Sequence, residues 1–383
     1  NFPPESGVKS LGCKPWRTEW AIIAANGAIE DRLFAEEHRG GVLCGVFDGH
    51  YGPRTADFCK RNVLPMFTKA MEQQNGNEEA SVKQTFEMLE QGWAAEVRTL
   101  LHRHDDFVSA REGACGLVAY ITPEKVVVGN VGDSRGVLYR QSKNSLEPMQ
   151  LTREHNAADP RERIALARAK PNDPSTVSYS TDNGSWYVKD TLQVTRAIGD
   201  LFLKSMEFYT PLPADMKPSP INFEPPYISW EPEVSVMEVD DKDDFLVLAS
   251  DGLWDELSNA DTAESLRRAV MEPGKCAARK QNCRDAFHRT GPAMADATKY
   301  ANVPLHTAEA LLWDALRANP YSRFFGVEEL LKLEAGEPRR DVHDDISIVV
   351  VWLQGGASVK PASLSLPRRI SAAAAGVVSS TTS

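Results

Sequence analysis

Three short apolar runs in this sequence each border on aspartate. They are residues 42–47, followed by Asp48; residues 245–249, followed shortly by Asp251; and residues 346–353, preceded by Asp344 and Asp345. Short apolar runs bounded by glycines and polar residues are typical of buried strands. Two runs carry the acid at the C-terminal end and one at the N-terminal end, so antiparallel pairing would bring the acids to one edge of a sheet.

Further acids occupy comparable positions in the chain. Glu30 and Asp31 follow the first predicted strand, and Asp133 lies in a turn between two others. Carboxylates that lie close together repel each other, which raises their pKa values unless a cation lies between them. A set of oxygen ligands favours Mg²⁺ or Mn²⁺ over Zn²⁺. Gly49, directly after Asp48, lets the backbone approach closely and present its carbonyl to an ion.

Each of these signals also has an ordinary structural explanation. Asp-Gly after a strand is common in turns, and Asp133 is a typical hairpin residue. His50, two residues after Asp48, is either a satisfied surface histidine or a functional one. The pair Arg196 and Asp200, in the stretch VTRAIGD, is predicted to be structural and to hold a strand to the next turn.

The composition restricts the classes of partner. Hydrophobic residues make up 42% of the 383 residues and the formal net charge is −11, which argues against nucleic acids and anionic membranes as general partners. No apolar run approaches the roughly 20 residues that span a bilayer. Six cysteines without a C-x-x-C pair indicate reduced thiols in an intracellular protein. The sequence starts at Asn1 without a methionine, so cytoplasm, nucleus and mitochondrion stay open as locations.

Periodicity predicts a mixture of strands and helices. Strands are predicted at residues 18–26, 40–47, 115–122, 125–131, 136–140, 233–239, 245–250 and 346–353. Helices are predicted at 54–71, with a kink or break at Pro65, and at 81–101, 161–170, 260–271 and 304–318. Residues 1–17 are predicted to be an N-terminal extension, about 204–232 an irregular insertion, about 272–340 a helical insertion, and 356–383 a disordered tail.

Seven motifs, taken in order, resemble those of the PP2C/PPM metal-dependent protein serine/threonine phosphatases. They are IED (29–31), GVFDGHYG (45–52), NVGDSRG (130–136), LTREHN (151–156), VTRAIGD (194–200), FLVLASDGLWD (245–255) and DDISIVVV (344–351). The resemblance covers residues 18–353, so we assign the phosphatase domain to residues 18–355. Within the family, AANGAIEDR (24–32), PPYISWEPEV (225–234) and the helical stretch before HDDIS are most similar to the pyruvate dehydrogenase phosphatase branch.

The resemblance implies an α+β fold. Two packed antiparallel β-sheets would form a β-sandwich flanked by α-helices, a four-layer αββα arrangement with a dinuclear site in the cleft at one end. Asp48 would bridge two Mn²⁺ or Mg²⁺ ions, and Gly49 would offer its carbonyl to one of them. Asp251 and Asp344 would complete the shell of the first ion, and Glu30 would hold the second ion through water. Asp133, Asp251 and Asp255 would bind a weaker third ion.

The activity that the resemblance implies is hydrolysis of phosphoserine and phosphothreonine in proteins. A metal-bridging water would attack in line, with His50 as general acid. Many family members carry an arginine four residues before the glutamate, where it grips the substrate phosphate, and this sequence has Asn26 there. An amide lacks the charge and the fork of a guanidinium, so we expect weaker phosphate binding. The pyruvate dehydrogenase phosphatase branch also lacks the arginine.

Two other functions remain open from the sequence. One is a pseudophosphatase that binds phosphoproteins, which the intact acids disfavour. The other is hydrolysis of nucleotides or nucleic-acid phosphodiesters, which the negative charge disfavours. We expect a monomer whose partner is a phosphorylated protein, bound through residues 211–226 and 272–303. In the tail, PRRIS places two arginines before Ser371 at a spacing that basophilic kinases use, with a flexible basic cluster as the alternative.

Overall fold

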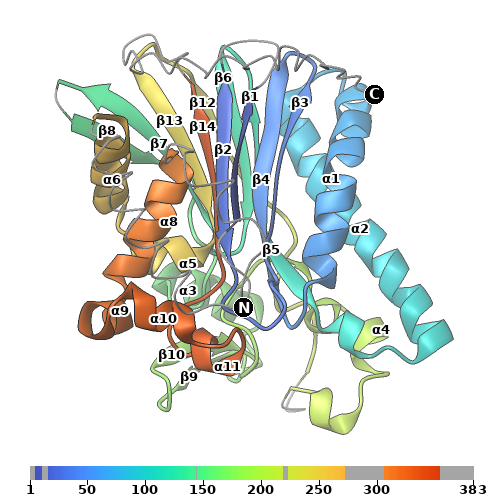
Figure 1. The fold of residues 1–383 in the computed structure, drawn as a ribbon. Coiled ribbons are helices and arrows are strands. Elements are labelled where there is room, and N and C mark those ends of the chain that lie inside the picture. The colour runs from blue at the N-terminus through green and yellow to red at the C-terminus, as the bar shows by residue number, and fades with distance from the viewer. Residues whose placement is uncertain (1–4, 11–15, 144, 219–222, 272–305, 354–383) are drawn as a thin grey trace, which may run out of the picture.

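Two antiparallel β-sheets stack face to face in the computed structural model, which describes residues 5–10, 16–143, 145–218, 223–271 and 306–353 (Figure 1). The first sheet has the order β1 (Glu5–Ser10), β2 (Arg17–Ile23), β14 (Ile346–Trp352), β13 (Asp243–Ala249), β7 (Arg135–Ser142) and β8 (Ser145–Gln150). The second has the order β12 (Glu233–Glu238), β6 (Lys125–Val131), β5 (Gly113–Ile121), β4 (Gly41–His50) and β3 (Arg32–His38), and β11 (Ile198–Gly199) also pairs with β5. The α+β sandwich predicted from the sequence is confirmed.

Strand β4 shows why the sheets stack. Its side chains alternate between two faces, as in any strand. Leu43 and Phe47 belong to the apolar cluster on the helix side, whereas Val42, Cys44 and Val46 belong to the cluster between the sheets. All five are fully buried. The first sheet contributes to the same central layer with Leu138, Leu246, Leu248, Val349 and Val351. A strand that is apolar on both faces has to be covered on both, here by a sheet and by helices.

Helices cover the two outer faces of the sandwich. On the second sheet lie α1 (Arg54–Gln73) and α2 (Glu78–His104), and on the first lie α6 (Asn259–Met271) and α8 (Thr307–Ala318) (Figure 1). The predicted break at Pro65 does not divide α1, which runs through it as one helix. Pro65 lies on the exposed side, while Val63 and Phe67 are buried against the core, so packing offsets the lost hydrogen bond.

The remaining elements are short. They are α3 (Pro160–Ala169), β9 (Val177–Ser180), β10 (Ser185–Val188), α4 (Met206–Tyr209), α5 (Asp251–Trp254), α9 (Pro320–Phe325), α10 (Val327–Lys332) and α11 (Glu337–Arg340), with 3₁₀ turns η1 (Val108–Ala110), η2 (Leu201–Leu203) and η3 (Ala214–Met216). The hairpin β9–β10 and helix α11 lie at the lower end of the sandwich in Figure 1. Within the described part of the chain, no helix is both long and apolar enough to cross a membrane.

The structure differs from the sequence-based expectation in two respects. The acidic strand ends do not share one sheet edge: β4 belongs to the second sheet, whereas β13 and β14 pair with each other in the first. Strand β1 lies within the predicted N-terminal extension and pairs with β2 along its whole length. The 272–303 surface, the 356–383 tail and Ser371 lie outside the described residues.

Candidate metal centre and active site

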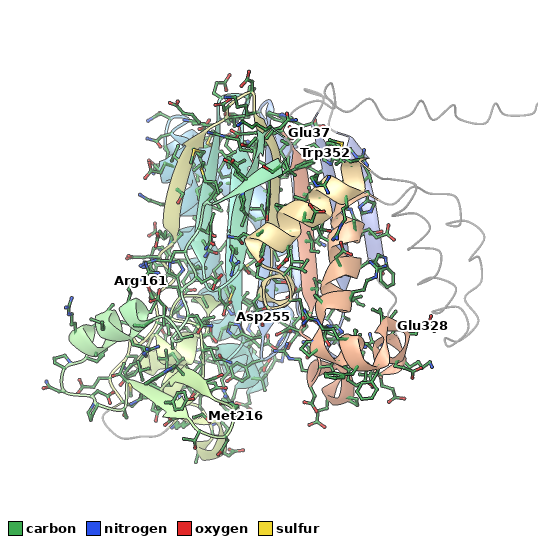
Figure 2. All side chains as sticks on the ribbon, turned by 90° about the vertical axis from the view of Figure 1, so that its left-hand side faces the viewer. Glu37, Arg161, Met216, Asp255, Glu328 and Trp352 are labelled. Atoms are coloured by element: carbon green, nitrogen blue, oxygen red, sulfur yellow. The ribbon has the colours of Figure 1, made fainter. Side chains whose placement is uncertain are left out.

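All seven residues predicted to bind metal line one pocket of about 830 Å³. They are Glu30, Asp48, Gly49, Asp133, Asp251, Asp255 and Asp344. Asp48 lies in β4 of the second sheet, whereas Asp251 follows β13 and Asp344 precedes β14 of the first. The acids therefore converge from the ends of both sheets. Figure 2 shows Asp255 near this end of the sandwich and Glu37 at the opposite end.

The carboxylates in the pocket repel one another and are poorly solvated. Burial raises the pKa of Asp48 well above its ordinary value, and the charges of Asp31, Asp251 and Asp133 raise it further. Burial also raises the pKa of Asp251, followed by the charges of Asp133 and Asp255. A divalent cation relieves both effects, because it favours the ionised form of each acid.

Asp31 lies behind Asp48 and is buried. Burial, and after it the charge of Asp345, raises the pKa of Asp31 to about 8. It accepts a hydrogen bond from Ser250 Oγ at 2.8 Å and hydrogen-bonds Asp48. The hydrogen bonds with Ser250 and Asp48 lower the pKa of Asp31 and offset these effects only in part.

Asp133 is held in place by two side chains. Asn156 Nδ2 donates to its Oδ2 at 2.8 Å, and Cys115 Sγ donates to its Oδ1 at 3.2 Å. Burial raises the pKa of Cys115 well above its ordinary value, followed by the charges of Asp133 and Asp48, so the thiol stays neutral. One ligand atom each from Asp48, Cys115 and Asp133 lies within 4.8 Å of the others. Cys115 carries no signal in the sequence beyond its position in a strand.

The donor set fits a hard divalent cation. Eight carboxylate side chains line the pocket, and six of them are predicted metal ligands. Together with the backbone at Gly49 these six offer oxygen ligands, which suit Mg²⁺ and Mn²⁺. Protonated Cys115 is a poor ligand for either ion. The residues expected to hold the ions are the seven predicted from the sequence, all of which line the pocket. Among them, Asp48 and Asp133 have ligand atoms within 4.8 Å of each other.

Two glycines allow backbone segments to meet beside the acids. A Cβ on Gly49 would lie 2.6 Å from the Glu30 carbonyl oxygen, and one on Gly252 would lie 2.2 Å from the Asp345 carbonyl oxygen. No side chain fits at such a distance. The glycine that follows each aspartate is therefore required for the close backbone approach that the sequence predicted.

Asp344 and Asp345 are neighbours in the sequence but have different surroundings in the structure. Asp345 is buried, and its Oδ1 accepts hydrogen bonds from the backbone N–H groups of Ala25 (2.6 Å) and Asn26 (3.0 Å). Its Oδ2 accepts one from the N–H of Glu30 at 2.8 Å. Asp345 thus fixes the loop that carries Glu30, whereas Asp344 faces the pocket.

His50 lines the pocket and pairs with a residue that the sequence assigned to another role. His50 Nε2 lies 2.8 Å from Asp200 Oδ2, and the Asp200 side chain is fully buried. Although burial lowers the pKa of His50, Asp200 raises it more strongly in sum with Asp133 and Glu30, and the pKa lies above its ordinary value.

The predicted structural pair of Arg196 and Asp200 is therefore wrong. Arg196 Nη1 donates instead to the Glu231 carbonyl at 2.9 Å. A glycine makes room for the histidine pair: a Cβ on Gly113 would lie 2.1 Å from Asp200 Oδ2 and 2.4 Å from His50 Nε2. The pairing spans 150 positions in the chain, so no local pattern could have indicated it.

Asn26, predicted to contact the substrate phosphate, is engaged with a neighbour. Its Nδ2 donates to Glu30 Oε2 at 3.2 Å, and Asn26 is not among the described residues that line the pocket. Four arginines do line it: Arg135, Arg153, Arg161 and Arg340.

Comparisons with known proteins point to one family. The family model described as protein phosphatase 2C matches residues 27–288. A "probable protein phosphatase 2C 34" of Oryza sativa subsp. indica is 31% identical over 366 residues, covering 92% of this chain and 86% of the relative. A "probable protein phosphatase 2C 67" of Arabidopsis thaliana is 29% identical over 342 residues, covering 87% of this chain and 82% of the relative.

Solved structures share the fold. The serine-threonine phosphatase 2C of Toxoplasma gondii superposes with a TM-score of 0.55 at 19% identity, covering 91% of this chain and 99% of that one. A C. elegans sex determining protein superposes with a TM-score of 0.56 at 17% identity, covering 89% of this chain and 66% of that one. At these identities the likeness concerns the fold alone.

Proposed function

Because the chain belongs to the protein phosphatase 2C family and is thus a protein phosphatase, we propose that it hydrolyses phosphoserine and phosphothreonine esters with two Mn²⁺ or Mg²⁺ ions. The observation that carries this proposal is the convergence of six acids from both sheets in one pocket beside His50. The metals, when bound, supply an activated water and neutralise the phosphoryl oxygens.

Different acids of this chain would bind the different ions. Asp48 would bind both ions, because it is buried and the charges of acids from both sheets act on it. Asp251 and Asp344 would complete the shell of one ion, and Glu30 would face the other, with the Gly49 carbonyl beside it. Asp133, Asp251 and Asp255, whose charges act on each other, would hold a weaker third ion.

His50 would donate the proton that the departing serine or threonine oxygen needs. A general acid must be protonated and near the leaving group. The raised pKa of His50 and its position in the pocket wall support this role. Asp200 would act as the positioning residue, since it holds the imidazole through Nε2 and favours its charged form.

Two substitutions separate metal binding from proton donation. Asp48→Ala should abolish Mn²⁺-dependent release of phosphate from p-nitrophenyl phosphate and from a phosphothreonine peptide, because it removes the bridging ligand. His50→Ala should keep Mn²⁺ binding, measured by calorimetry, and lower kcat on the peptide by about 10²- to 10⁴-fold. Wild-type turnover in His50→Ala would disprove the acid role. Hydrolysis of bis(p-nitrophenyl) phosphate at a higher rate than the monoester would instead favour a phosphodiesterase.

The narrower substrate is a separate part of the proposal. The three stretches similar to the pyruvate dehydrogenase phosphatase branch, together with Asn26, support a phosphorylated dehydrogenase as substrate and a mitochondrial location. The relatives named above carry the family name alone. Phosphoproteomics of cells that lack this protein would test the substrate: a dehydrogenase phosphosite that does not accumulate would count against it.

A further inference from the structure

Arginine is the side chain that most often recognises a phosphate group in proteins, because its guanidinium presents two parallel donors to two oxygens. Four arginines line the pocket, and three of them are committed elsewhere. Arg135 donates to Glu154 and Asn259 and stacks on Trp254, with its guanidinium carbon 4.9 Å from the ring centre. Its donors are therefore already used for structure.

Arg153 and Arg161 also donate hydrogen bonds to acidic side chains. Arg153 donates two hydrogen bonds to Glu233 Oε2, at 3.2 and 2.9 Å. Arg161 donates to both carboxylate oxygens of Asp159, at 2.7 to 3.2 Å, and its side chain is 68% exposed. Neither partner belongs to the acids predicted to bind metal.

Arg340 differs from these three. Within the described residues its side chain forms one ion pair, with Asp344, which is itself a predicted metal ligand. The Arg340 side chain lines the pocket and is 45% exposed. Although burial raises the pKa values of Glu30, Asp251 and Asp255, the charge of Arg340 lowers all three, which places this charge among the pocket acids.

The backbone of Arg340 is fixed beside the loop that carries Asn26. Its neighbour Arg339 is buried and donates to the Ala24 carbonyl at 3.0 Å and to the Leu333 carbonyl at 2.6 Å. The N–H of Gly336 donates to the Ala25 carbonyl at 2.8 Å. These hydrogen bonds hold helix α11, and with it Arg340, beside the loop that carries Asn26.

The geometry points to Arg340 as the phosphate-binding arginine of this enzyme, an inference that rests on the proposed phosphatase function. A cation bound by Asp344 would compete for that carboxylate and release the guanidinium donors of Arg340. A guanidinium can then hold two phosphoryl oxygens at once, which an amide at position 26 cannot do.

The test compares wild type with Arg340→Gln and Arg340→Lys at saturating Mn²⁺. Loss of a charged hydrogen bond should raise KM for p-nitrophenyl phosphate and Ki for inorganic phosphate roughly 10- to 100-fold in Arg340→Gln. Arg340→Lys keeps the positive charge but loses the paired donors of the guanidinium. KM and Ki of this variant should therefore lie between those of wild type and those of Arg340→Gln. Arg267→Gln, which removes a paired arginine on α6 outside the pocket, should leave both constants unchanged.

Two further measurements make the outcome decisive. Mn²⁺ affinity, determined by calorimetry, should change less than threefold in Arg340→Gln. Unchanged KM and Ki in this variant would overturn the inference, as would a KM effect that vanishes when more Mn²⁺ is added, because Arg340 would then serve the metal site. If wild type itself shows no Mn²⁺-dependent hydrolysis, the proposed function fails before Arg340 is tested.

Discussion

At the scale of single residues, the pair of His50 and Asp200 offers the sharpest test of the proposed proton donor. Asp200→Asn keeps the shape of the side chain but removes the charge that orients the imidazole and favours its protonated form. We expect kcat for a phosphothreonine peptide to fall roughly 10- to 100-fold, a part of what a general acid contributes. KM and Mn²⁺ affinity should change little, because Asp200 does not line the pocket.

A carboxylate outside the pocket provides the control for this substitution. Glu207→Gln removes a charge from an exposed pair with Arg98, 2.6 Å apart, and should leave kcat unchanged. Gly113→Ala should reproduce the loss seen in Asp200→Asn, since its Cβ would lie within 2.4 Å of both partners. Full turnover in Asp200→Asn would rule out a positioning role for this residue.

Sequence reasoning identified the acids of the site and missed the residues that orient them. Asp48, Asp251 and Asp344 stand next to apolar strands, which is a local signal. Asp200 contacts His50, which lies 150 positions away in the chain, and Cys115 contacts Asp133, which lies 18 positions away. Such pairings depend on how the strands are arranged in the sheets. Arg196, which is close to Asp200 in the sequence, was therefore predicted as its partner in place of His50.

At the scale of elements, a buried ion pair fixes the irregular segment between α3 and the second sheet. Asp173 Oδ2 accepts hydrogen bonds from Lys189 Nζ at 3.0 Å and from Tyr227 Oη at 2.8 Å, and Ser175 Oγ donates to Oδ1 at 2.6 Å. The Lys189 side chain is fully buried. Burial by itself raises the pKa of Asp173, but these hydrogen bonds outweigh it and lower the pKa to about 2.

Asp173→Asn should lower the free energy of unfolding by about 3 to 5 kcal/mol at pH 7, because it removes the carboxylate charge beside the buried ammonium group of Lys189. The folded pKa of Asp173 lies below its ordinary value, so its contribution is fully present above about pH 4 and is lost as the pH falls through 2. Urea unfolding of both proteins from pH 7 downwards should therefore show a stability gap that narrows below pH 4.

An exposed pair of the same chemistry is the control. Glu79→Gln breaks the contact with Lys83 (2.8 Å) on α2, where both side chains are about half exposed, and should cost less than about 1 kcal/mol. Equal losses for Asp173→Asn and Glu79→Gln would show that the buried network does not stabilise the segment.

Strands β1, β3 and β8, which the sequence did not predict, lie at sheet edges. β3 has exposed glutamates at positions 36 and 37, and β8 alternates between exposed and half-buried residues. Apolar periodicity identifies a strand only when at least one face is buried. The central strands β4, β5, β13 and β14 are buried along most of their length, and their prediction is confirmed.

At the scale of the whole molecule, the fold brings carboxylates of both sheets together at one end of the sandwich. This is the end at which Figure 2 labels Asp255. Burial first, and then repulsion, raises the pKa values of Asp48, Asp251 and Asp255, so the ionised forms destabilise the metal-free protein. The sequence predicted that the acids meet, but it assigned them to one sheet edge. Only the stacking of two sheets defines the pocket between them.

Mn²⁺ should therefore stabilise the whole fold. A ligand that binds only the native state adds about 2.7 kcal/mol at 100 times its Kd, so Tm in calorimetry should rise by several degrees and return when EDTA removes the metal. Asp251→Asn takes one charge out of the cluster, so its metal-free Tm should exceed that of the metal-free wild type while its response to Mn²⁺ is mostly lost. Glu79→Gln should respond like wild type. A metal-free Asp251→Asn that melts below wild type and still gains stability from Mn²⁺ would contradict an acid cluster that is held together by cations.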